Sequence, residues 1–194
     1  MEQRQIVACG VVVTCAALAG VYALWACWFS GTLAPQPVVR PAAPQDFQIR
    51  VLADVPGVDI PKFEDVSKAA ISAQAEVVGV CVNGLARAYP LSLLKRVDYH
   101  IVNDLFDGKP LSITYCNLAD RVRVLTWKHR GYRIPLSVGG LDENRQLLFV
   151  FGDGERFRQD SKSLPLDDHP FARMTLGEWS SRHPRSLVFV GAPE

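Results

Sequence analysis

The amino-terminal segment constrains this chain most, because no Asp, Glu, Lys or Arg occurs between Arg4 and Arg40. Residues 6–29 are almost wholly apolar, and as a helix they can cross the roughly 30 Å hydrocarbon core of a bilayer. Aromatic side chains that favour the membrane interface gather at the far end of this segment, at Tyr22, Trp25 and Trp28. The pattern predicts one transmembrane helix over residues 6–29, which anchors the chain in the membrane.

The position of the basic residues predicts how this anchor is oriented. Arg4 precedes the apolar segment, which favours a cytoplasmic N-terminus of residues 1–5 and an exported body. We therefore expect a single-pass protein of the cell inner membrane, with its C-terminal domain on the periplasmic or extracytoplasmic side. Two alternatives remain open. One is a cleaved signal peptide, whose apolar core is usually shorter, and the other is a lipoprotein signal ending at Cys27, which Trp25 fits poorly.

The segment after the anchor, residues 30–46, is rich in Pro and Ala and predicts an extended, semi-rigid linker. The remaining residues, 47–194, are long enough for one globular domain. The chain carries 21 Lys and Arg against 20 Asp and Glu, a net charge of +1. This balance argues against a nucleic-acid partner, which would require a basic face or tract. The membrane is the partner that the sequence predicts directly.

The domain reads as many short strands with a few short helices. Strands are expected at residues 47–52, 76–82, 85–89, 111–115, 121–127, 132–138, 146–151 and 187–190. A short strand or bend is expected at residues 99–102, and a polar strand or turn at residues 155–159. Asn83-Gly84 is a strong hairpin signal, Asp107-Gly108 marks another turn, and Gly139-Gly140 is expected to break the chain. Residues 56–63 are expected to form a loop. Helices are expected at residues 91–97 and 175–182, with one or two helical turns within residues 64–73. The fold class predicted is α+β, mainly antiparallel β, as a curled sheet or partly open barrel.

The stretch from 83 to 120 gathers the side chains most capable of chemistry. Cys116 ends a predicted strand and can act as a nucleophile or ligand where its thiolate is stabilised. It can equally be a small buried hydrophobe, or half of a disulfide with Cys81 in an exported body. His100 can act as a general base or metal ligand, or simply pack and bond a backbone group. Asp104 can orient a histidine, but Asn-Asp is also ordinary turn chemistry.

Three further residues are candidates for ligand contact. Tyr115 and Asn103 lie beside the candidate catalytic residues Cys116, His100 and Asp104, and Arg121 follows Cys116 closely. Arg121 can lower a thiol pKa or bind an anion, or it can simply belong to the exposed face of a strand. The histidines at 129, 169 and 183 match no strong ligand spacing, and we assign none of them to a site.

Several ordered motifs of the domain resemble the bacterial and archaeal family catalogued as domain of unknown function 3179. They lie at residues 83–90, 101–104, 108–110, 114–116, 178–179, 183–184 and 187–188. The resemblance implies an exported or membrane-tethered domain with no established activity. It also implies a Cys-x-x-Cys pair, whose second position is Ala119 here, and a histidine one place earlier than His100. A two-cysteine redox or metal role therefore cannot be carried over unchanged.

Two functions are compatible with these features. The first is a membrane-anchored extracytoplasmic module that binds a small molecule or an envelope protein, favoured by the missing second cysteine. The second is a thiol- or metal-dependent enzyme centred on Cys116 and His100. The sequence identifies neither a cofactor nor a metal.

Overall fold

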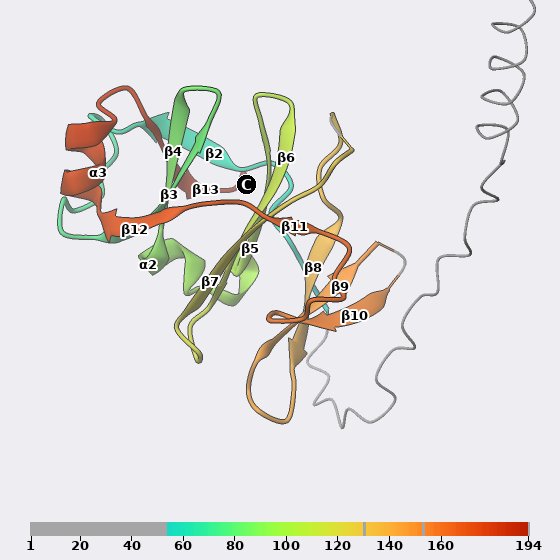
Figure 1. The fold of residues 1–194 in the computed structure, drawn as a ribbon. Coiled ribbons are helices and arrows are strands. Elements are labelled where there is room, and N and C mark those ends of the chain that lie inside the picture. The colour runs from blue at the N-terminus through green and yellow to red at the C-terminus, as the bar shows by residue number, and fades with distance from the viewer. Residues whose placement is uncertain (1–53, 130, 153, 194) are drawn as a thin grey trace, which may run out of the picture. The chain divides into compact units, whose positions relative to one another are not determined.

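The computed structural model describes residues 54–129, 131–152 and 154–193. The predicted anchor at 6–29, the linker and the strand expected at 47–52 lie outside these ranges. Within the described residues, no helix is both long enough and apolar enough to cross a membrane. Three β-sheets and a few short helices make up the described part (Figure 1).

The largest sheet has five strands, and it positions the candidate site. Its order is β12 (Ala172–Thr175), β3 (Glu76–Val82), β4 (Leu85–Pro90), β13 (Leu187–Gly191) and β2 (Lys62–Asp65). All neighbours are antiparallel except β4 and β13, which pair in parallel through Leu187 with Arg87 and Val188 with Ala88. The first residues of β4 therefore extend beyond the start of β13, and the sheet is open at that point.

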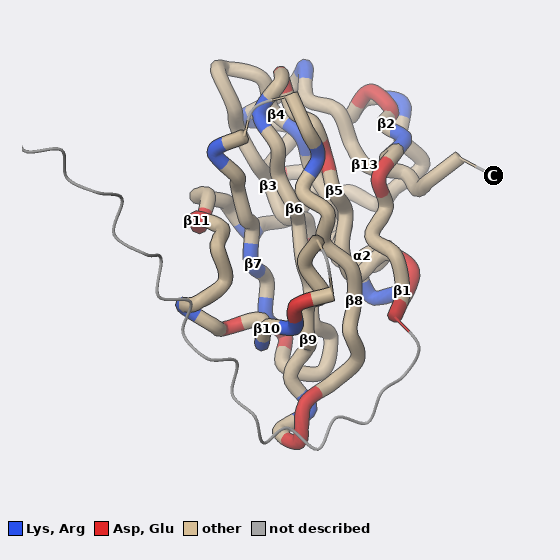
Figure 2. Tube along the Cα trace, turned by 90° about the vertical axis from the view of Figure 1, so that its right-hand side faces the viewer, with Lys and Arg blue, Asp and Glu red and all other residues tan. Residues whose placement is uncertain are grey.

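The other two sheets are antiparallel and have four strands each. One has the order β11 (Asp167–Asp168), β7 (Arg121–Thr126), β6 (Lys109–Cys116) and β5 (Ile101–Phe106). The other has the order β1 (Val55–Pro56), β8 (Leu136–Leu141), β9 (Leu147–Phe151) and β10 (Glu155–Arg158). Charged residues occur mainly at strand ends and turns, while the central spans of β6 and β9 are uncharged (Figure 2).

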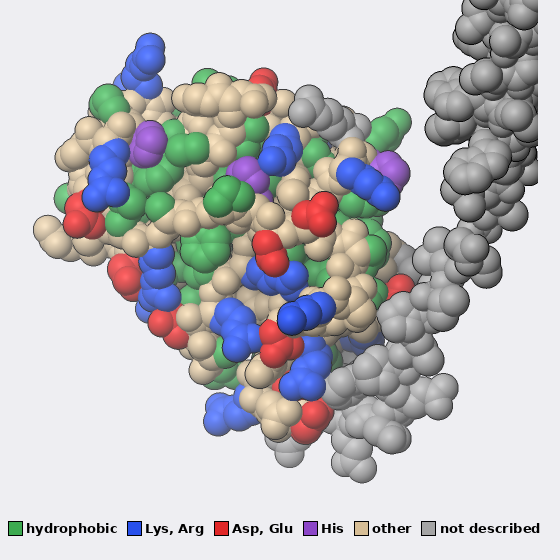
Figure 3. Space-filling view, viewed as in Figure 1, with side chains coloured by type: hydrophobic (Ala, Val, Ile, Leu, Met, Phe, Trp, Pro, Cys, Tyr) green, Lys and Arg blue, Asp and Glu red, His purple; other side chains and the backbone are tan. Residues whose placement is uncertain are grey.

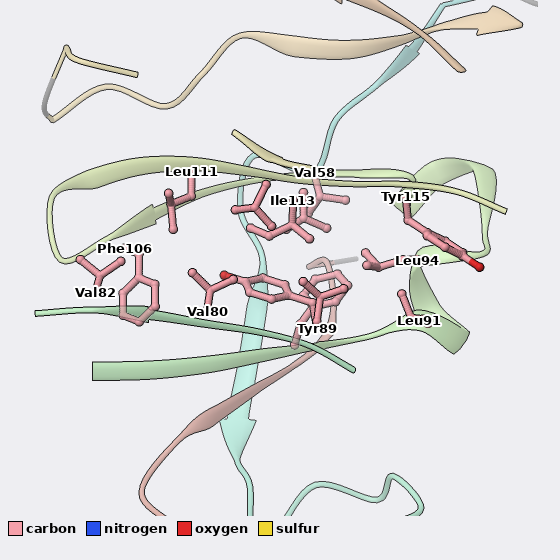
Figure 4. Close-up of a cluster of buried hydrophobic side chains, with 14 residues drawn as sticks. Val58, Val80, Val82, Tyr89, Leu91, Leu94, Phe106, Leu111, Ile113 and Tyr115 are labelled. Atoms are coloured by element: carbon pink, nitrogen blue, oxygen red, sulfur yellow. The ribbon is translucent and has the colours of Figure 1, made fainter. Parts of the chain in front are cut away.

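Apolar side chains fill the spaces between the sheets. One cluster joins β3 and β4 to β5 and β6, where Val80, Val82 and Tyr89 face Leu111 and Ile113 (Figure 4). A second cluster lies between β5–β7 and β8–β10, and a third lies beneath helix α3 (Leu176–Arg182). Strand β3 contributes to both the first and the third cluster, which explains its nearly continuous apolar run.

Both predicted hairpin turns are confirmed by the backbone angles. Asn83 and Gly84 have φ of 50° and 80°, and Asp107 and Gly108 have φ of 52° and 71°. Positive φ at both central residues is typical of the type I′ turn, whose twist matches that of the paired strands. The helix predicted at 175–182 is also confirmed, including its capping box between Thr175 and Glu178.

The mainly antiparallel α+β prediction is confirmed, and the expected curled sheet or partly open barrel takes the form of three sheets that do not close. The expected helix at 91–97 is α2 (Leu91–Leu94) followed by the 3-10 turn η1 (Val97–Tyr99).

Two local predictions are wrong. Residues 64–73 form no helix, because β2 occupies residues up to Asp65, whose carboxylate then accepts the Ser67 N–H at 2.9 Å in a turn. The pair Gly139-Gly140 lies inside β8 and does not break the strand. A register shift between Val138 and Leu141 absorbs the irregularity there as a β-bulge.

Strand boundaries also differ from the prediction at three places. Strand β5 runs to Phe106, so Asn103 and Asp104 lie in a strand and not before a turn. Residues 132–135 precede β8, and the expected loop at 56–63 contains the start of β2. Strands β11 and β12 are absent from the prediction, and each exists by pairing with a longer neighbour.

Candidate functional site

Cys116 is the last residue of β6, and its side chain is 2% exposed. It belongs to the apolar cluster between two sheets, together with residues such as Leu125 and Phe149. Cys81 is exposed, and both thiols are free, so the disulfide considered from the sequence is not formed. In this setting Cys116 packs as a small hydrophobe.

His100 is buried at the end of the 3-10 turn that follows α2. Its Nδ1 lies 2.8 Å from the carbonyl oxygen of Leu94. A carbonyl oxygen can only accept, so Nδ1 carries the proton and donates it. The ring thereby ties the end of α2 to the start of β5, which is the packing role considered for it from the sequence.

Asp104 forms a buried charged cluster with two residues of β4. Its Oδ2 accepts hydrogen bonds from the guanidinium of Arg87 and from the hydroxyl of Tyr89, the latter at 2.6 Å. Burial, reinforced by the charge of Asp104, raises the pKa of Tyr89 well above its usual value, so the phenol stays protonated and donates. The Arg87 guanidinium is also held between two rings, 4.4 Å from the centroid of Phe63 and 4.3 Å from that of Phe106.

Asn103 uses its amide entirely inside the domain. Its Nδ2 donates to Asp59 Oδ1 and to the carbonyl of Leu136, both at 2.9 Å. Its Oδ1 accepts the hydroxyl of Ser112 at 2.6 Å. The side chain therefore links β5 to β6 and to the start of β8, and it fixes how two sheets pack.

Tyr115 and Arg121 lie near the two ends of the β6–β7 turn. The Tyr115 hydroxyl donates to Asp120 Oδ1 at 2.9 Å, and burial together with this hydrogen bond raises the pKa of Tyr115 to about 12. Arg121 Nη1 lies 3.2 Å from Asp160 Oδ2 in a partly exposed ion pair. Each of these polar groups has a protein partner.

The six residues proposed from the sequence do not form one site in the described part of the chain. No hydrogen bond or ion pair among described residues joins Cys116, His100 and Asp104 to one another. The polar members of the set are engaged with residues that hold sheets and turns together. The catalytic and ligand-binding roles assigned to them stay predictions.

A cleft of about 620 Å³ opens elsewhere, at the gap in the five-stranded sheet. One wall is formed by residues 84–87 at the start of β4, and the other by residues 182–187, which connect α3 to β13. Phe106 of β5 also contributes. The volume lies within the range typical of small-molecule sites.

Basic side chains dominate the polar part of this cleft. Arg87, Arg182, His183 and Arg185 line it, and the described lining residues include neither Asp nor Glu. Asp104 balances the charge of Arg87, and Glu178 lies one helical turn before Arg182, close enough for Arg182 to help lower its pKa. Among the described residues, Arg182 and Arg185 take part in no ion pair.

The wall formed by residues 182–187 is held in place by several hydrogen bonds. The indole N–H of Trp179 donates to the hydroxyl of the buried Ser186 at 3.1 Å. The N–H of Ser186 donates to the carbonyl of His183, and the Ser186 carbonyl accepts the N–H of Val66. The wall is therefore formed before any ligand arrives.

A thiol and an imidazole lie at the rim of the cleft. Cys81 Sγ is 3.9 Å from His183 Nε2, and the His183 ring packs on Trp179 with centroids 4.1 Å apart. Figure 3 shows a histidine and Lys or Arg side chains beside α3 on this face. Burial raises the pKa of Cys81, so the thiol form predominates at neutral pH.

His169 lies next to this rim and contacts the backbone of Cys81. Lys109 Nζ lies 3.1 Å from His169 Nδ1, and His169 Nε2 lies 3.3 Å from the carbonyl oxygen of Cys81. Burial and the charge of Lys109 lower the pKa of His169, which favours a neutral ring that accepts from Lys109 and donates to the carbonyl. Within the described residues, no three His, Cys, Asp or Glu side chains are grouped to hold a metal ion.

The comparison with protein families identifies the domain. The family described as "Protein of unknown function (DUF3179)" matches residues 53–194. The chain belongs to this family. No curated protein and no solved structure matches the chain.

Membership confirms the resemblance, and the cleft joins three of the motifs that carried it. In this DUF3179 domain, residues 84–87 of the motif at 83–90 form one wall, and residues 183, 184 and 187 lie in the other. Ala119 is exposed in the β6–β7 turn, three residues after the buried Cys116. The two positions of the Cys-x-x-Cys pattern are thus a buried core position and a surface position.

Sequence reasoning about this DUF3179 domain missed Arg87, His183 and Cys81 as members of one site. From the sequence, His183 is assigned to no site, and Cys81 is considered only as a possible disulfide partner of Cys116. Arg87 and His183 lie in separate motifs and Cys81 lies just before the first of them, and the parallel pairing of β13 with β4 brings these segments together. The motifs at 83–90 and 183–184 both belong to the pattern of one family, and this was the signal that could have suggested their contact.

Proposed function

We propose that this DUF3179 chain is a membrane-anchored binding module that takes a small ligand in the cleft between residues 84–87 and 182–187. The observation that carries the proposal is the cleft itself, which has one wall held by hydrogen bonds and a polar lining that is mainly basic. A preformed concave site with a few convergent polar groups is the usual form of a small-molecule site.

The anchor and the location belong to the same proposal. Residues 6–29 form the single transmembrane helix, residues 30–46 form the linker, and the domain lies on the extracytoplasmic side of the inner membrane. The support is the charge-free apolar segment and the position of Arg4 before it.

An enzyme centred on Cys116 and His100 has less support. Burial of Cys116 among apolar side chains and the engagement of His100 with a backbone carbonyl both fit packing roles. Neither residue lines the cleft.

Ligand binding in the cleft can be tested by matched substitutions on the full chain. Leu85 lines the cleft and is 53% exposed, while Val97 lies outside it and is 54% exposed. Leu85→Trp places a large ring in the cleft, whereas Val97→Trp adds the same ring elsewhere. Compounds that raise the unfolding temperature of the wild type should do so for V97W but not for L85W. Equal stabilisation of both variants would place binding outside the cleft.

The proposed topology predicts the behaviour of reporter fusions. Alkaline phosphatase fused after the C-terminus should be active, because it folds outside the cytoplasm, and green fluorescent protein fused there should be dark. Deletion of residues 6–29 should reverse both results and release the chain from the membrane fraction. Fluorescence of the full-length fusion would contradict the topology.

A further inference from the structure

From the charges and walls of the cleft, we propose that its ligand is a small amphipathic oxyanion, a carboxylate or phosphate attached to an apolar group. This inference rests on the proposed function and names the chemical class that the site takes.

The cleft has an excess of basic side chains over acidic ones. Arg182 and Arg185 line it and take part in no ion pair among the described residues. Arg87 adds a guanidinium whose position is fixed by Asp104 and by two aromatic rings. Guanidinium groups bind carboxylates and phosphates through paired N–H donors, which is the recognition that these side chains offer.

Hydrogen-bond donors of β4 lie near the gap in the sheet. In a two-residue hairpin the flanking residues Val82 and Leu85 exchange hydrogen bonds, so the N–H of Ala86 points away from β3. Strand β13 begins opposite Arg87, and the N–H of Ala86 therefore faces the cleft before that pairing starts. The Nε of Arg87 is buried and has no hydrogen-bond partner among the described residues. Of these two donors, the N–H of Ala86 belongs to a residue that lines the cleft at the gap in the sheet.

Apolar side chains form another part of the lining of the cleft. Leu85 and Leu187 are each more than one third exposed, and both line the cleft with Phe106. The cleft holds about 620 Å³, which is far more than a bare phosphate or carboxylate fills. An apolar group attached to the anion would cover these side chains and gain affinity from their burial.

The experiment measures the binding of four probes to the full chain in a non-ionic detergent by isothermal titration calorimetry. Phenyl phosphate and 3-phenylpropanoate carry the two headgroups, 3-phenylpropanamide is the neutral match, and inorganic phosphate lacks the ring. We expect at least one of the two anions to bind roughly tenfold or more tightly than the amide, and phenyl phosphate to bind more tightly than inorganic phosphate. The anion that binds more tightly shows whether the preferred headgroup is a phosphate or a carboxylate.

Charge-matched variants locate the interaction. The double variant Arg182→Gln/Arg185→Gln should weaken the binding of the anions roughly tenfold and leave that of the amide unchanged. The control Arg96→Gln/Arg121→Gln removes the same charge from residues that do not line the cleft, and it should leave all affinities unchanged. Added salt should weaken anion binding by the wild type.

Four outcomes overturn the inference. Equal affinity for the amide and the anions would reject the oxyanion class and keep the binding module. If the two double variants weaken anion binding equally, the oxyanion class is likewise rejected and the binding module is kept. If none of the four probes binds while other compounds stabilise V97W but not L85W, the class is wrong and the cleft is still a binding site. If no compound binds there at all, the proposed function fails as well.

Discussion

Polar residues that look capable of chemistry in the sequence can instead be the ones that a β-rich fold needs inside. Asn103 and Asp104 are neighbours on β5, and their side chains satisfy different sets of buried partners. A buried amide or carboxylate is costly unless its hydrogen bonds are made, so such residues are tightly constrained by structure alone. Chemical capability and structural necessity are therefore hard to separate in a single sequence.

The two cysteines of the described domain should differ in reactivity. Cys81 is exposed and Cys116 is buried, so iodoacetamide should alkylate only Cys81 in the native chain, as read by peptide mass mapping. Burial raises the pKa of Cys81 from 9.0, and the rate should therefore keep rising as the pH passes 9. Cys116 should react only after unfolding. Labelling of Cys116 in the native chain would show an opening that the structure does not contain.

Removing the charge of Asp104 should be severely destabilising. Asp104→Asn leaves the mostly buried guanidinium of Arg87 beside Tyr89 without its counter-charge, and breaking a buried ion pair typically costs about 3–5 kcal/mol. Asp98→Asn removes an exposed partner of Arg96 and should cost about 0–1 kcal/mol. Urea unfolding of the full chain measures both. Similar midpoints for the two variants would show that the buried pair contributes no more than a surface pair.

Little of the candidate site could be predicted from the sequence, and the reason is physical. Sequence patterns report burial and local turns, and they identified the hairpin at Asn83 and the cap at Thr175. The cleft instead depends on where β13 starts relative to β4, which no local pattern encodes. Arg87 reads as one residue of an alternating strand until its aromatic and acidic neighbours are placed around it.

At the scale of elements, helix α3 packs on the five-stranded sheet with one very close approach, at Trp179. The indole of Trp179 lies directly over Gly79 of β3, where a Cβ would come within 2.1 Å of the ring. The same indole holds Ser186 in the wall of the cleft. The Trp179 indole therefore helps to fix both the position of α3 and the shape of the cleft.

Gly79→Ala should therefore destabilise the domain by about 1–3 kcal/mol, the typical cost of forcing extra volume into a packed core. Because the clash is with Trp179, the Trp179→Phe substitution should cost less in the Gly79→Ala background than in the wild type. Thermal unfolding of the four proteins of this cycle measures the coupling. Strictly additive effects would show that Gly79 and Trp179 do not contact each other.

Elements that carry their own sequence pattern were predicted, and those defined by a partner were not. Strands β3, β7 and β9 have runs of apolar or alternating residues, and they lie where the sequence places them. Strand β11 consists of Asp167 and Asp168, which suit a loop. Its pairing with β7, reinforced by the ion pair of Arg123 with Asp168, overrides that local preference.

At the scale of the whole molecule, the segments around β6, β11 and β3 are linked by one histidine. His169 lies between Lys109 and the carbonyl of Cys81, and its pKa is lowered by burial and by the lysine. As the pH falls, the unfolded chain binds this proton first, near pH 6.5. The stabilising contribution is therefore complete above pH 6.5 and is lost as the pH falls below it.

His169→Asn should consequently reduce the dependence of the unfolding free energy on pH between about 7 and 5. His129 is exposed, and His129→Asn is the matched substitution at the surface. Denaturant unfolding at a series of pH values makes the comparison. A steeper decline for His169→Asn than for the wild type would reverse the assigned sign.

The central claim is that an anion binds between the start of β4 and the connection from α3 to β13. Backbone amide NMR of the isotope-labelled full chain, titrated with phenyl phosphate, tests it most directly. The account predicts that the largest chemical-shift changes occur at residues 84–87 and 182–187, with the N–H of Ala86 among them. Changes concentrated around Cys116 and His100, or scattered over the surface, would contradict it.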